Sequence, residues 1–202
     1  MKYILPMLPM ILLYSVSGCA LSDAKLDVRY DQDKIVPGPL SKVKPVIIQV
    51  TKFEDKRSKT EQIGYKRNLF GWATADVLTN EPVVDIVRNA VVATFEKNGH
   101  IVSDEQPNIV CSGDVETFWF ETQVNFWTEE FMGTIDIILT IKDPSTNSNV
   151  FSKRYVGHKN AEMMYGYHKE MAQVMNSTLK DVMSQIETDP ELIDIIKHYS
   201  GP

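Results

Sequence analysis

Hydrophobic residues alternate with polar ones along several stretches of the chain, and this pattern predicts β-strands. The β-branched run over 46–50, continued to Phe53, has the pattern of a first strand with at least one buried face. Three further strands are predicted over 109–120, 131–142 and 150–156. Along the second of these, apolar residues occupy one face and polar residues the other, as in an antiparallel sheet with one solvated face.

Two longer segments show helical spacing instead. The first helix is predicted to begin at Asn80 as N-cap, with Pro82 in its first turn, and to end at Gly99. Its apolar stripe, which would pack on a sheet, consists of Val83, Val87, Ala90, Val91, Thr94 and Phe95. The closing helix carries a second stripe, made of Met171, Val174, Met175, Thr178, Leu179, Val182 and Ile186. Asp189 and Pro190 then begin a short last helix.

The order of these elements predicts the fold class. A strand, a helix, strands in a meander and two helices indicate an α+β fold, with a mostly antiparallel β-sheet and helices packed on one face. The 202 residues, of which 43% are hydrophobic and 24% charged, fit one globular domain. Residues 20–44 are polar and contain prolines, so we expect a flexible tether over 19–44, with one edge strand near 26–30. The predicted domain covers 45–202.

Residues 1–18 have the pattern of an export signal. Lys2 is followed by an apolar run over 3–14, which as a helix would rise about 18 Å, well short of a roughly 30 Å hydrocarbon core. Ser17 and Gly18 directly precede Cys19, an arrangement that resembles the lipobox of bacterial lipoproteins. The resemblance implies cleavage between Gly18 and Cys19 and a diacylglyceryl group on the Cys19 thiol. The alternatives are an ordinary secretory signal cleaved near Gly18, or a buried core helix.

Acyl chains on Cys19 would anchor the mature domain to a membrane without spanning it. Ala20 follows the lipidation site in place of an aspartate, which by the sorting habit of such lipoproteins implies the outer membrane, facing the periplasm. The net charge is −6, from 21 basic and 27 acidic residues. An acidic domain is repelled by anionic lipid, so acylation has to provide the attachment, and nucleic acid is not an expected partner.

The sequence contains no motif for catalysis, metal binding or a cofactor. The histidines lack paired spacing and stand at positions 100, 158, 168 and 198. No GxSxG, Walker A or GxGxxG pattern occurs. Cys111 is interpreted as a small buried hydrophobe in preference to a nucleophile or redox sensor. The methionines assigned to the closing helix are interpreted as core residues in preference to an adaptable binding surface: Met163, Met164, Met171, Met175 and Met183.

The 26 residues over 54–79 are rich in charge and are interpreted as a long loop, either functional or partly disordered. Gly64 and Gly71 permit turns, and Asp55 is placed to pair with Arg57 or Arg67. We take this loop as the candidate partner-binding surface, formed by Asp55, Arg57, Gly64, Arg67, Asn68 and Gly71. The alternative is a self-structured Ω-like loop without a partner.

The lipobox, the segment F-E-D-K-R at 53–57 and the segment I-G-Y-K-R-N-L-F-G-W at 63–72 together resemble the YajG-like lipoprotein family. The helix between Asn80 and Gly99 adds to this resemblance, which covers about 46–199. It implies a bacterial outer-membrane lipoprotein without an established set of catalytic residues.

A second candidate surface is an aromatic hairpin, whose large residues are Phe118, Trp119, Phe120, Phe126, Trp127 and Phe131. Because consecutive residues of a strand point to opposite faces, Phe118 and Phe120 cannot share the face of Trp119. Either a second helix covers one aromatic face, or Trp119, Phe126 and Trp127 form an apolar surface for a partner or an acyl chain.

Two functions of different class follow. The first is a noncatalytic envelope lipoprotein that docks another envelope protein or the cell wall through the loop containing Arg67 and Asn68. The second is a lipid-handling accessory subunit of an envelope transport system, which would use the aromatic hairpin. The membrane, reached through the N-terminal acyl chains, is the other expected partner. We expect no enzyme activity, and no oligomeric state is predicted.

Overall fold

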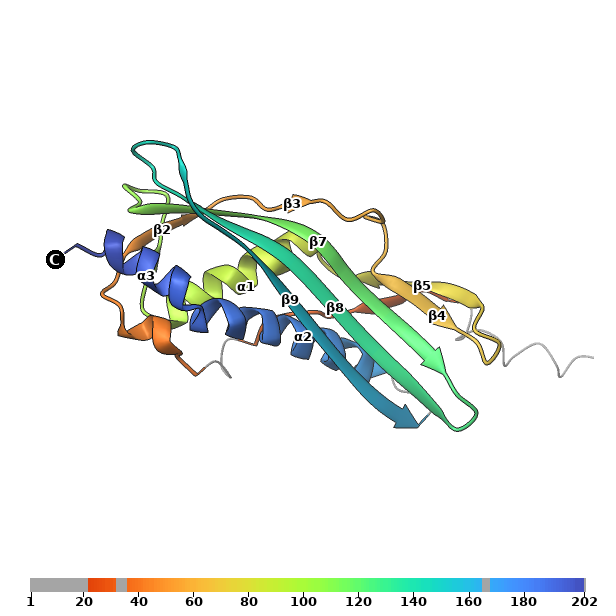
Figure 1. Ribbon diagram of the computed structural model, residues 1–202. Coiled ribbons are helices and arrows are strands. Elements are labelled where there is room, and N and C mark those ends of the chain that lie inside the picture. Colours follow the sequence, from red (N-terminus) through yellow and green to blue (C-terminus); the bar gives the residue numbers. More distant parts are fainter. Residues whose placement is uncertain (1–21, 32–35, 165–167, 202) are drawn as a thin grey trace, which may run out of the picture.

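The computed structural model describes residues 22–31, 36–164 and 168–201. The predicted signal segment and its lipidation site Cys19 lie outside these residues. The elements follow one another as shown in Figure 1, in the order β1 (Ala24–Leu26), η2 (Pro39–Lys42), β2 (Ile47–Val50), β3 (Glu54–Asp55), β4 (Gly64–Arg67), β5 (Ala73–Thr79), α1 (Val83–Lys97), β6 (Ile101–Val102), β7 (Ile109–Val124), β8 (Thr128–Lys142), β9 (Asn149–Met164), α2 (His168–Thr188) and α3 (Pro190–Tyr199).

The strands of the described chain form one mixed sheet around β7. The longest pairings, β7 with β8 and β8 with β9, are antiparallel and make the predicted meander. The first part of β7 pairs in parallel with β2, and its later part pairs in parallel with β4. β4 and β5 are antiparallel, and β1 extends the sheet beside β5. The expected α+β fold is confirmed, with a parallel component that the sequence pattern did not show.

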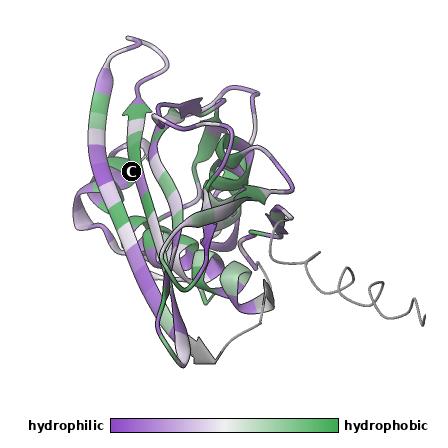
Figure 2. Ribbon diagram, turned by 90° about the vertical axis from the view of Figure 1, so that its right-hand side faces the viewer, coloured by the Kyte–Doolittle hydropathy of each residue, from purple (hydrophilic) through white to green (hydrophobic). Residues whose placement is uncertain are grey.

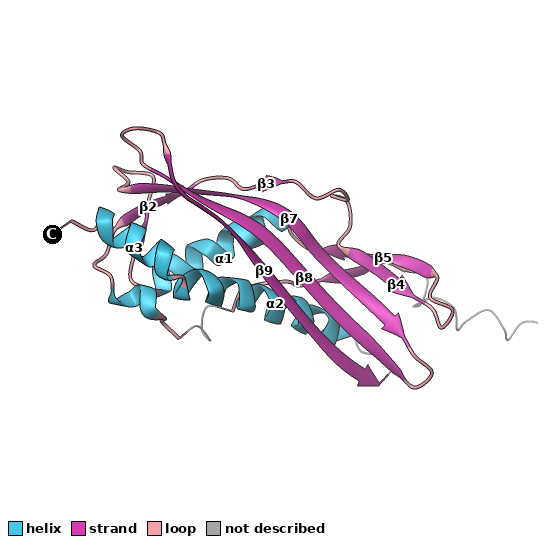
Figure 3. Cartoon of the chain, viewed as in Figure 1, coloured by secondary structure: helices cyan, strands magenta, loops and turns pink. Residues whose placement is uncertain are grey.

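The helices cover one face of this sheet. α2 packs along β8 and β9, whereas α1 packs on β7 and β6, so the core lies between the helix layer and the sheet (Figure 3). Hydrophobic and hydrophilic bands alternate along the longest strands in Figure 2. The predicted inward face of β8 is buried and consists of Phe131, Gly133, Ile135, Ile137, Leu139 and Ile141. The half-solvated sheet pattern is therefore confirmed.

The C-terminal end of α1 was predicted correctly and its N-terminal end was not. The helix ends as expected, because Gly99 follows it with φ +88°, a conformation that favours glycine. Its start differs: Pro82, not Asn80, is the N-cap. The Asn80 amide donates instead to the Leu26 carbonyl oxygen, and so continues the pairing of β1 with β5. All six residues of the predicted stripe are buried.

The C-terminal helices agree with the prediction. The stripe predicted for α2 is buried along its whole length. Asp189 is the N-cap of α3, and its Oδ1 accepts a hydrogen bond from the Glu191 amide at 3.0 Å. One assignment was wrong: Met163 and Met164 belong to the end of β9 and not to a helix.

Part of the predicted tether is folded against the body. Ala24–Leu26 pairs with β5, and Leu26 and Val28 are buried. Further along, η2 places Leu40 in the core, where it is fully buried. The prolines do not prevent this packing, because Leu26, Val28 and Leu40 bury enough apolar surface to hold these stretches on the domain.

The predicted loop over 54–79 was also wrong. It contains β3, β4 and β5, and the last two form an antiparallel hairpin whose turn covers 68–72. Some of the charged residues that suggested a loop lie within these strands, as Asp55 does in β3 and Lys66 and Arg67 do in β4. Lys66, for example, is buried, and its ammonium group donates a hydrogen bond to a backbone carbonyl oxygen that compensates for the lost water.

Candidate functional site

The chain leading into β4 is held by a buried arginine. The Arg57 guanidinium donates from Nε and Nη2 to the two carboxylate oxygens of Asp55, at 2.9 and 2.8 Å. It also binds the carbonyl oxygens of Gln62 and Thr60, at 3.2 and 3.0 Å. Burial alone would raise the pKa of Asp55, but the hydrogen bonds from Arg57 hold that pKa below its usual value. The predicted pairing of Asp55 with Arg57 is confirmed, and it fixes the local backbone.

Gly64 lets β4 lie directly against β7. It pairs with Phe120 in a parallel arrangement, and a Cβ atom at position 64 would lie 2.0 Å from the Phe120 carbonyl oxygen. Both strands run in the same direction from this pair, so β4 ends at Arg67 and β7 ends at Val124 on the same side of it. The turns that follow the two strands thus lie at one end of the molecule, as Figure 1 shows.

Asn68 and Gly71 shape the turn between β4 and β5. The Asn68 side chain accepts hydrogen bonds from the amides of Phe70 and Trp72, both at 3.0 Å. The Gly71 amide donates to the Asn68 carbonyl oxygen at 2.8 Å, and Gly71 has φ +78°. The turn exposes three large apolar side chains, Leu69 (62%), Phe70 (79%) and Trp72 (70%). We call these three residues the first aromatic tip.

The turn between β7 and β8 carries a second exposed apolar pair. It is closed by the Asn125 amide, which donates to the Thr128 carbonyl oxygen at 2.8 Å. Phe126 and Trp127 lie between them and are 76% and 75% exposed. Their rings pack edge to face, with centroids 4.7 Å apart. We call Phe126 and Trp127 the second aromatic tip, and the two tips together the aromatic end.

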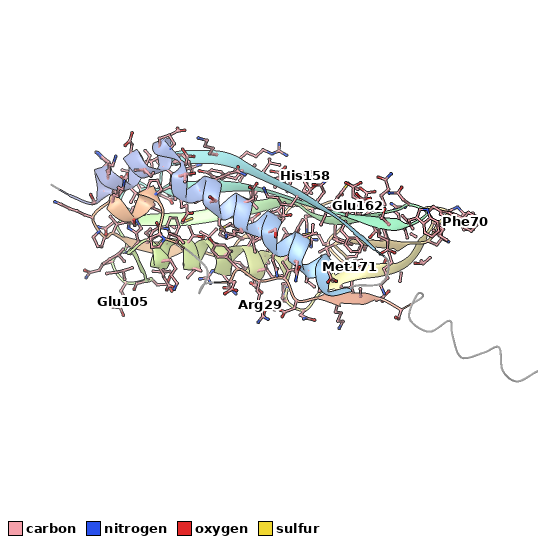
Figure 4. All side chains as sticks on the ribbon, turned by 90° about the horizontal axis from the view of Figure 1, so that it is seen from below. Arg29, Phe70, Glu105, His158, Glu162 and Met171 are labelled. Carbon is pink, nitrogen blue, oxygen red and sulfur yellow. The ribbon has the colours of Figure 1, made fainter. Side chains whose placement is uncertain are left out.

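The aromatic end lies opposite the C-terminal helix. Figure 4 places Phe70 at one extreme of the molecule and Glu105 at the other, and Figure 1 shows α3 at the end away from the turn between β4 and β5. Of the eight large hydrophobic residues that are exposed in the described chain, five belong to the aromatic end. Apolar surface gathered in one place marks an interaction surface, whereas scattered exposed residues do not.

Two charged residues of β4 position this end. Arg67 donates from Nη1 to the Gly71 carbonyl oxygen at 2.8 Å, and its Nη2 lies 3.6 Å from Glu121 Oε1 on β7, so it joins the two hairpins. Lys66 donates from Nζ to the carbonyl oxygen of Ser22 at 2.8 Å. The first described residue is therefore held beside the β4–β5 hairpin.

The predicted partner-binding residues do not form one exposed polar loop. Their polar groups bind other groups of the same chain and so stabilise the hairpin and its turn. The six residues are Asp55, Arg57, Gly64, Arg67, Asn68 and Gly71. The large apolar side chains that are exposed in this segment are those of the first aromatic tip, which the predicted site did not include. The signal was present in the run L-F-G-W at 69–72, since three large apolar residues beside a turn glycine are unusual in a solvated loop.

Trp119 does not join Phe126 and Trp127 in one surface. It lies on the open face of the sheet, where its ring contacts Tyr65 edge to face with centroids 5.6 Å apart. The Lys59 ammonium nitrogen lies 5.4 Å from the centroid of the Trp119 ring, at cation–π distance. The predicted apolar surface of three residues was therefore wrong for Trp119, whereas Phe126 and Trp127 are exposed together.

The other aromatic residues of the hairpin are buried. Phe118, Phe120 and Phe131 lie on the helix-covered face, with the Phe120 and Phe131 ring centroids 5.5 Å apart. α2 crosses close above them, because a Cβ atom added to Gly133 would meet the sulfur of Met175 at 3.0 Å. The alternative that a second helix covers these rings is confirmed.

The described residues offer few groups for chemistry. A hollow of about 280 Å³ is lined by Arg57, Ser58, Lys59, Glu116, Thr117, Phe118 and Trp119. Cys111 is fully buried, and burial raises the pKa of its thiol, so it packs as a hydrophobe. Within the described chain, no group of three or more His, Cys, Asp or Glu side chains is arranged to hold a metal ion. None of the described helices is long and apolar enough to cross a membrane.

Comparison with family models identifies the family. The model of the Lipoprotein_16 family, described as uncharacterized lipoprotein, matches residues 41–197. The chain belongs to this lipoprotein family. A member of this family is a membrane-anchored envelope protein. The search of curated proteins found no match.

Comparison with solved structures finds similar chains from several bacteria. Protein XCC0632 from Xanthomonas campestris has 13% identity and a TM-score of 0.57, over 86% of this chain and 96% of that chain. PelC from Paraburkholderia phytofirmans, solved as a dodecamer, has 13% identity and a TM-score of 0.42, over 74% and 93%. A minor lipoprotein from Acinetobacter baumannii has 11% identity and a TM-score of 0.41, over 73% and 94%. At 13% identity, the similarity to XCC0632 shows a shared fold and nothing about function.

Proposed function

We propose that this lipoprotein is a noncatalytic binding module of the outer membrane, facing the periplasm, whose binding surface is the aromatic end. In this proposal residues 1–18 are removed and acyl chains on Cys19 anchor the mature protein. The observation that carries the proposal is the exposure of five large apolar side chains on two neighbouring turns. The membership in a lipoprotein family supports the anchor, and the YajG-like motifs and Ala20 support the outer-membrane location.

The construction of the aromatic end supports a binding role. Asn68 holds its turn with two hydrogen bonds, and Arg67 connects that turn to β7. Exposed aromatic side chains on a fixed backbone lose little conformational freedom when they bind, which makes them effective anchor residues. The lipid-handling alternative would use the aromatic hairpin as an acyl-chain surface. Its inner aromatic residues are buried on the helix-covered face, and Trp119 packs against Tyr65 instead of joining Phe126 and Trp127.

Replacement of the lipidated cysteine tests the anchor. Cys19→Ser removes the thiol that carries the acyl chains, so we expect the protein to move from the membrane pellet to the soluble periplasmic fraction. The parent chain should stay in the pellet through a high-salt wash, because acyl anchoring does not depend on charge. A Cys19→Ser protein that still sediments and resists salt would contradict the proposal.

Photocrosslinking in intact cells tests the binding surface. A photoreactive residue at Trp72 or Trp127 should give adducts, whereas the same residue at Glu105, exposed at the opposite end, should give few. Adducts at Glu105 with none at either tip would place the binding surface elsewhere.

A further inference from the structure

We infer that the partner of the aromatic end is the bilayer itself: the two tips rest in the interfacial region of a membrane of zwitterionic phospholipid, beside the acyl chains. This inference rests on the proposed function, because it requires the anchor at Cys19. It adds a second contact between protein and lipid, made by the folded domain.

The first step is the position of the anchor. Only two residues separate Cys19 from Ser22, so their Cα atoms lie at most about 10 Å apart. Lys66 holds the carbonyl group of Ser22, and Lys66 is two residues before Asn68, which directly precedes the first tip. Along a strand this is about 7 Å. The short link from Ser22 therefore keeps the acylated residue close to the first tip. Because the acyl chains lie in the bilayer, the domain cannot stand far from the membrane.

The second step is the direction in which the tips point. Gly64 and Phe120 form a parallel pair, and both chains run from it toward the aromatic end. The first tip begins five residues after Gly64, at Leu69, and the second begins six residues after Phe120, at Phe126. The two tips thus project by similar lengths of chain on the side of the molecule where the described chain begins.

The third step is the chemistry of the tips. Tryptophan has an apolar ring and one N–H donor, and it is enriched where hydrocarbon meets lipid headgroups. Each tip pairs one tryptophan with a phenylalanine, as Trp72 with Phe70 and Trp127 with Phe126, and the ring centroids lie 5.7 and 4.7 Å apart. Leu69 adds apolar surface to the first tip. Protruding rings of this kind suit a yielding lipid interface better than a preformed protein pocket.

The fourth step is the charge behind the tips. Glu129 and Glu130 follow Thr128 at the start of β8, close behind the second tip, and Glu162 lies opposite Glu130 on β9. These carboxylates disfavour anionic headgroups, in agreement with the net charge of −6. Arg67 pairs with another carboxylate, that of Glu121, and so does not offset the charge of these three. A zwitterionic surface avoids the repulsion, so the expected lipid is phosphatidylethanolamine or phosphatidylcholine.

The three tryptophans of the chain allow a test with an internal control. Trp72 and Trp127 belong to the tips, whereas Trp119 lies seven residues before Phe126 along β7, or about 20 Å back from the second tip. Full-length acylated protein with one tryptophan each is made by Trp→Phe changes at the other two positions. The proteins are attached to phosphatidylcholine vesicles with or without brominated acyl chains, which quench tryptophan fluorescence on contact.

The inference predicts that bromolipid quenches the Trp72-only and Trp127-only proteins and leaves the Trp119-only protein unquenched. Flotation of the vesicles is measured in parallel. If the proteins float and neither tip is quenched, the inference is overturned while the anchored lipoprotein stands. Quenching of one tip alone contradicts the two-tip contact, and quenching of Trp119 shows that the sheet face lies on the bilayer instead. Proteins that do not float overturn both the anchor and the inference.

Lipid charge gives a second readout. Addition of phosphatidylglycerol to the vesicles at low salt should reduce quenching of Trp127, the tip beside the glutamates, and salt should restore it. An increase in quenching with anionic lipid would overturn the zwitterionic assignment.

Discussion

Three polar side chains around the aromatic end and the segment leading to it hold backbone groups in place. Lys66 binds the carbonyl of Ser22, Asn68 binds two amides of its own turn, and Arg57 binds two carbonyls beside Asp55. In a sequence, lysine, asparagine and arginine suggest residues that contact a binding partner. Their partners are instead within the chain, which leaves contact with the outside to the apolar residues that they position.

The Arg57 site gives a prediction about stability. Arg57→Lys keeps the charge but cannot reach Asp55 and both carbonyl groups at once, so we expect a loss of about 2–3 kcal/mol in the free energy of unfolding. Chemical denaturation measures the change. The neighbouring Lys56→Ala, at an exposed ion pair, is the control and should have almost no effect. Equal effects of the two variants would show that the buried guanidinium does not hold this segment.

Asp189 gives a prediction about pH. Burial by itself would raise its pKa, but hydrogen bonds from Tyr155, Lys153 and the Glu191 amide lower the pKa below the usual 3.8. A lowered pKa means that the ionised carboxylate stabilises the fold above pH 3.8, and that this contribution is lost as the pH falls through the lower folded-state value. Asp189→Asn keeps a capping side chain without the charge.

We therefore expect Asp189→Asn to cost about 1–3 kcal/mol at neutral pH. The difference from the parent protein should shrink as the pH falls below 3.8, when the parent carboxylate becomes protonated. Urea denaturation at a series of pH values measures both. A difference that stays constant across this range would mean that the charge on Asp189 is not what stabilises α3.

The β4–β5 hairpin is the element whose placement matters most for the site. It contacts the rest of the sheet through the pairing of Gly64 with Phe120 and through β1. It also carries the first aromatic tip and holds the start of the described chain. A change that separates β4 from β7 should therefore disturb the relative position of the two tips without unfolding the core beneath α2.

Gly64→Ala makes such a change. The added methyl group would overlap the Phe120 carbonyl oxygen, so we expect a loss of roughly 1–3 kcal/mol. Hydrogen exchange of the Phe120 amide, which donates to the Ile63 carbonyl oxygen, should become faster. Gly71→Ala is the control, because its methyl group meets nothing within 4 Å and strains only the local φ. It should leave Phe120 protected, and equal exchange in the two variants would contradict this account.

The whole molecule is elongated, with the aromatic end and the C-terminal helix at opposite extremes (Figures 1 and 4). β7 alone has 16 residues and would span about 50 Å when extended. If the aromatic end rests on the membrane, the Glu105 end stands well away from it. The orientation of the domain then follows from three attachments, the acyl chains and the two tips.

Energy transfer to a dye in the lipid headgroups measures this orientation. A fluorophore on Gln123→Cys, beside the second tip, should transfer strongly, and one on Glu105→Cys should transfer weakly. The label stays specific because Cys111 is fully buried and Cys19 is acylated in our proposal. Similar transfer from both positions would mean that the domain lies flat or moves freely on its anchor.

The sequence by itself determined the elements that depend on local periodicity. The stripes of α1 and α2, the inward face of β8 and the cap at Asp189 follow from residues within a few positions of one another, so their pattern could be read directly. The α+β class followed from the order of these elements.

Only the tertiary structure decided the short strands and the site. β1 and β4 are held by partners far away in the chain, as Ala24 of β1 is by Val77 and Gly64 of β4 is by Phe120. Phe120 and Phe126 are the same residue type six positions apart, yet one is fully buried beneath a helix and the other is exposed. Burial depends on what packs above a residue, and no local pattern contains that information.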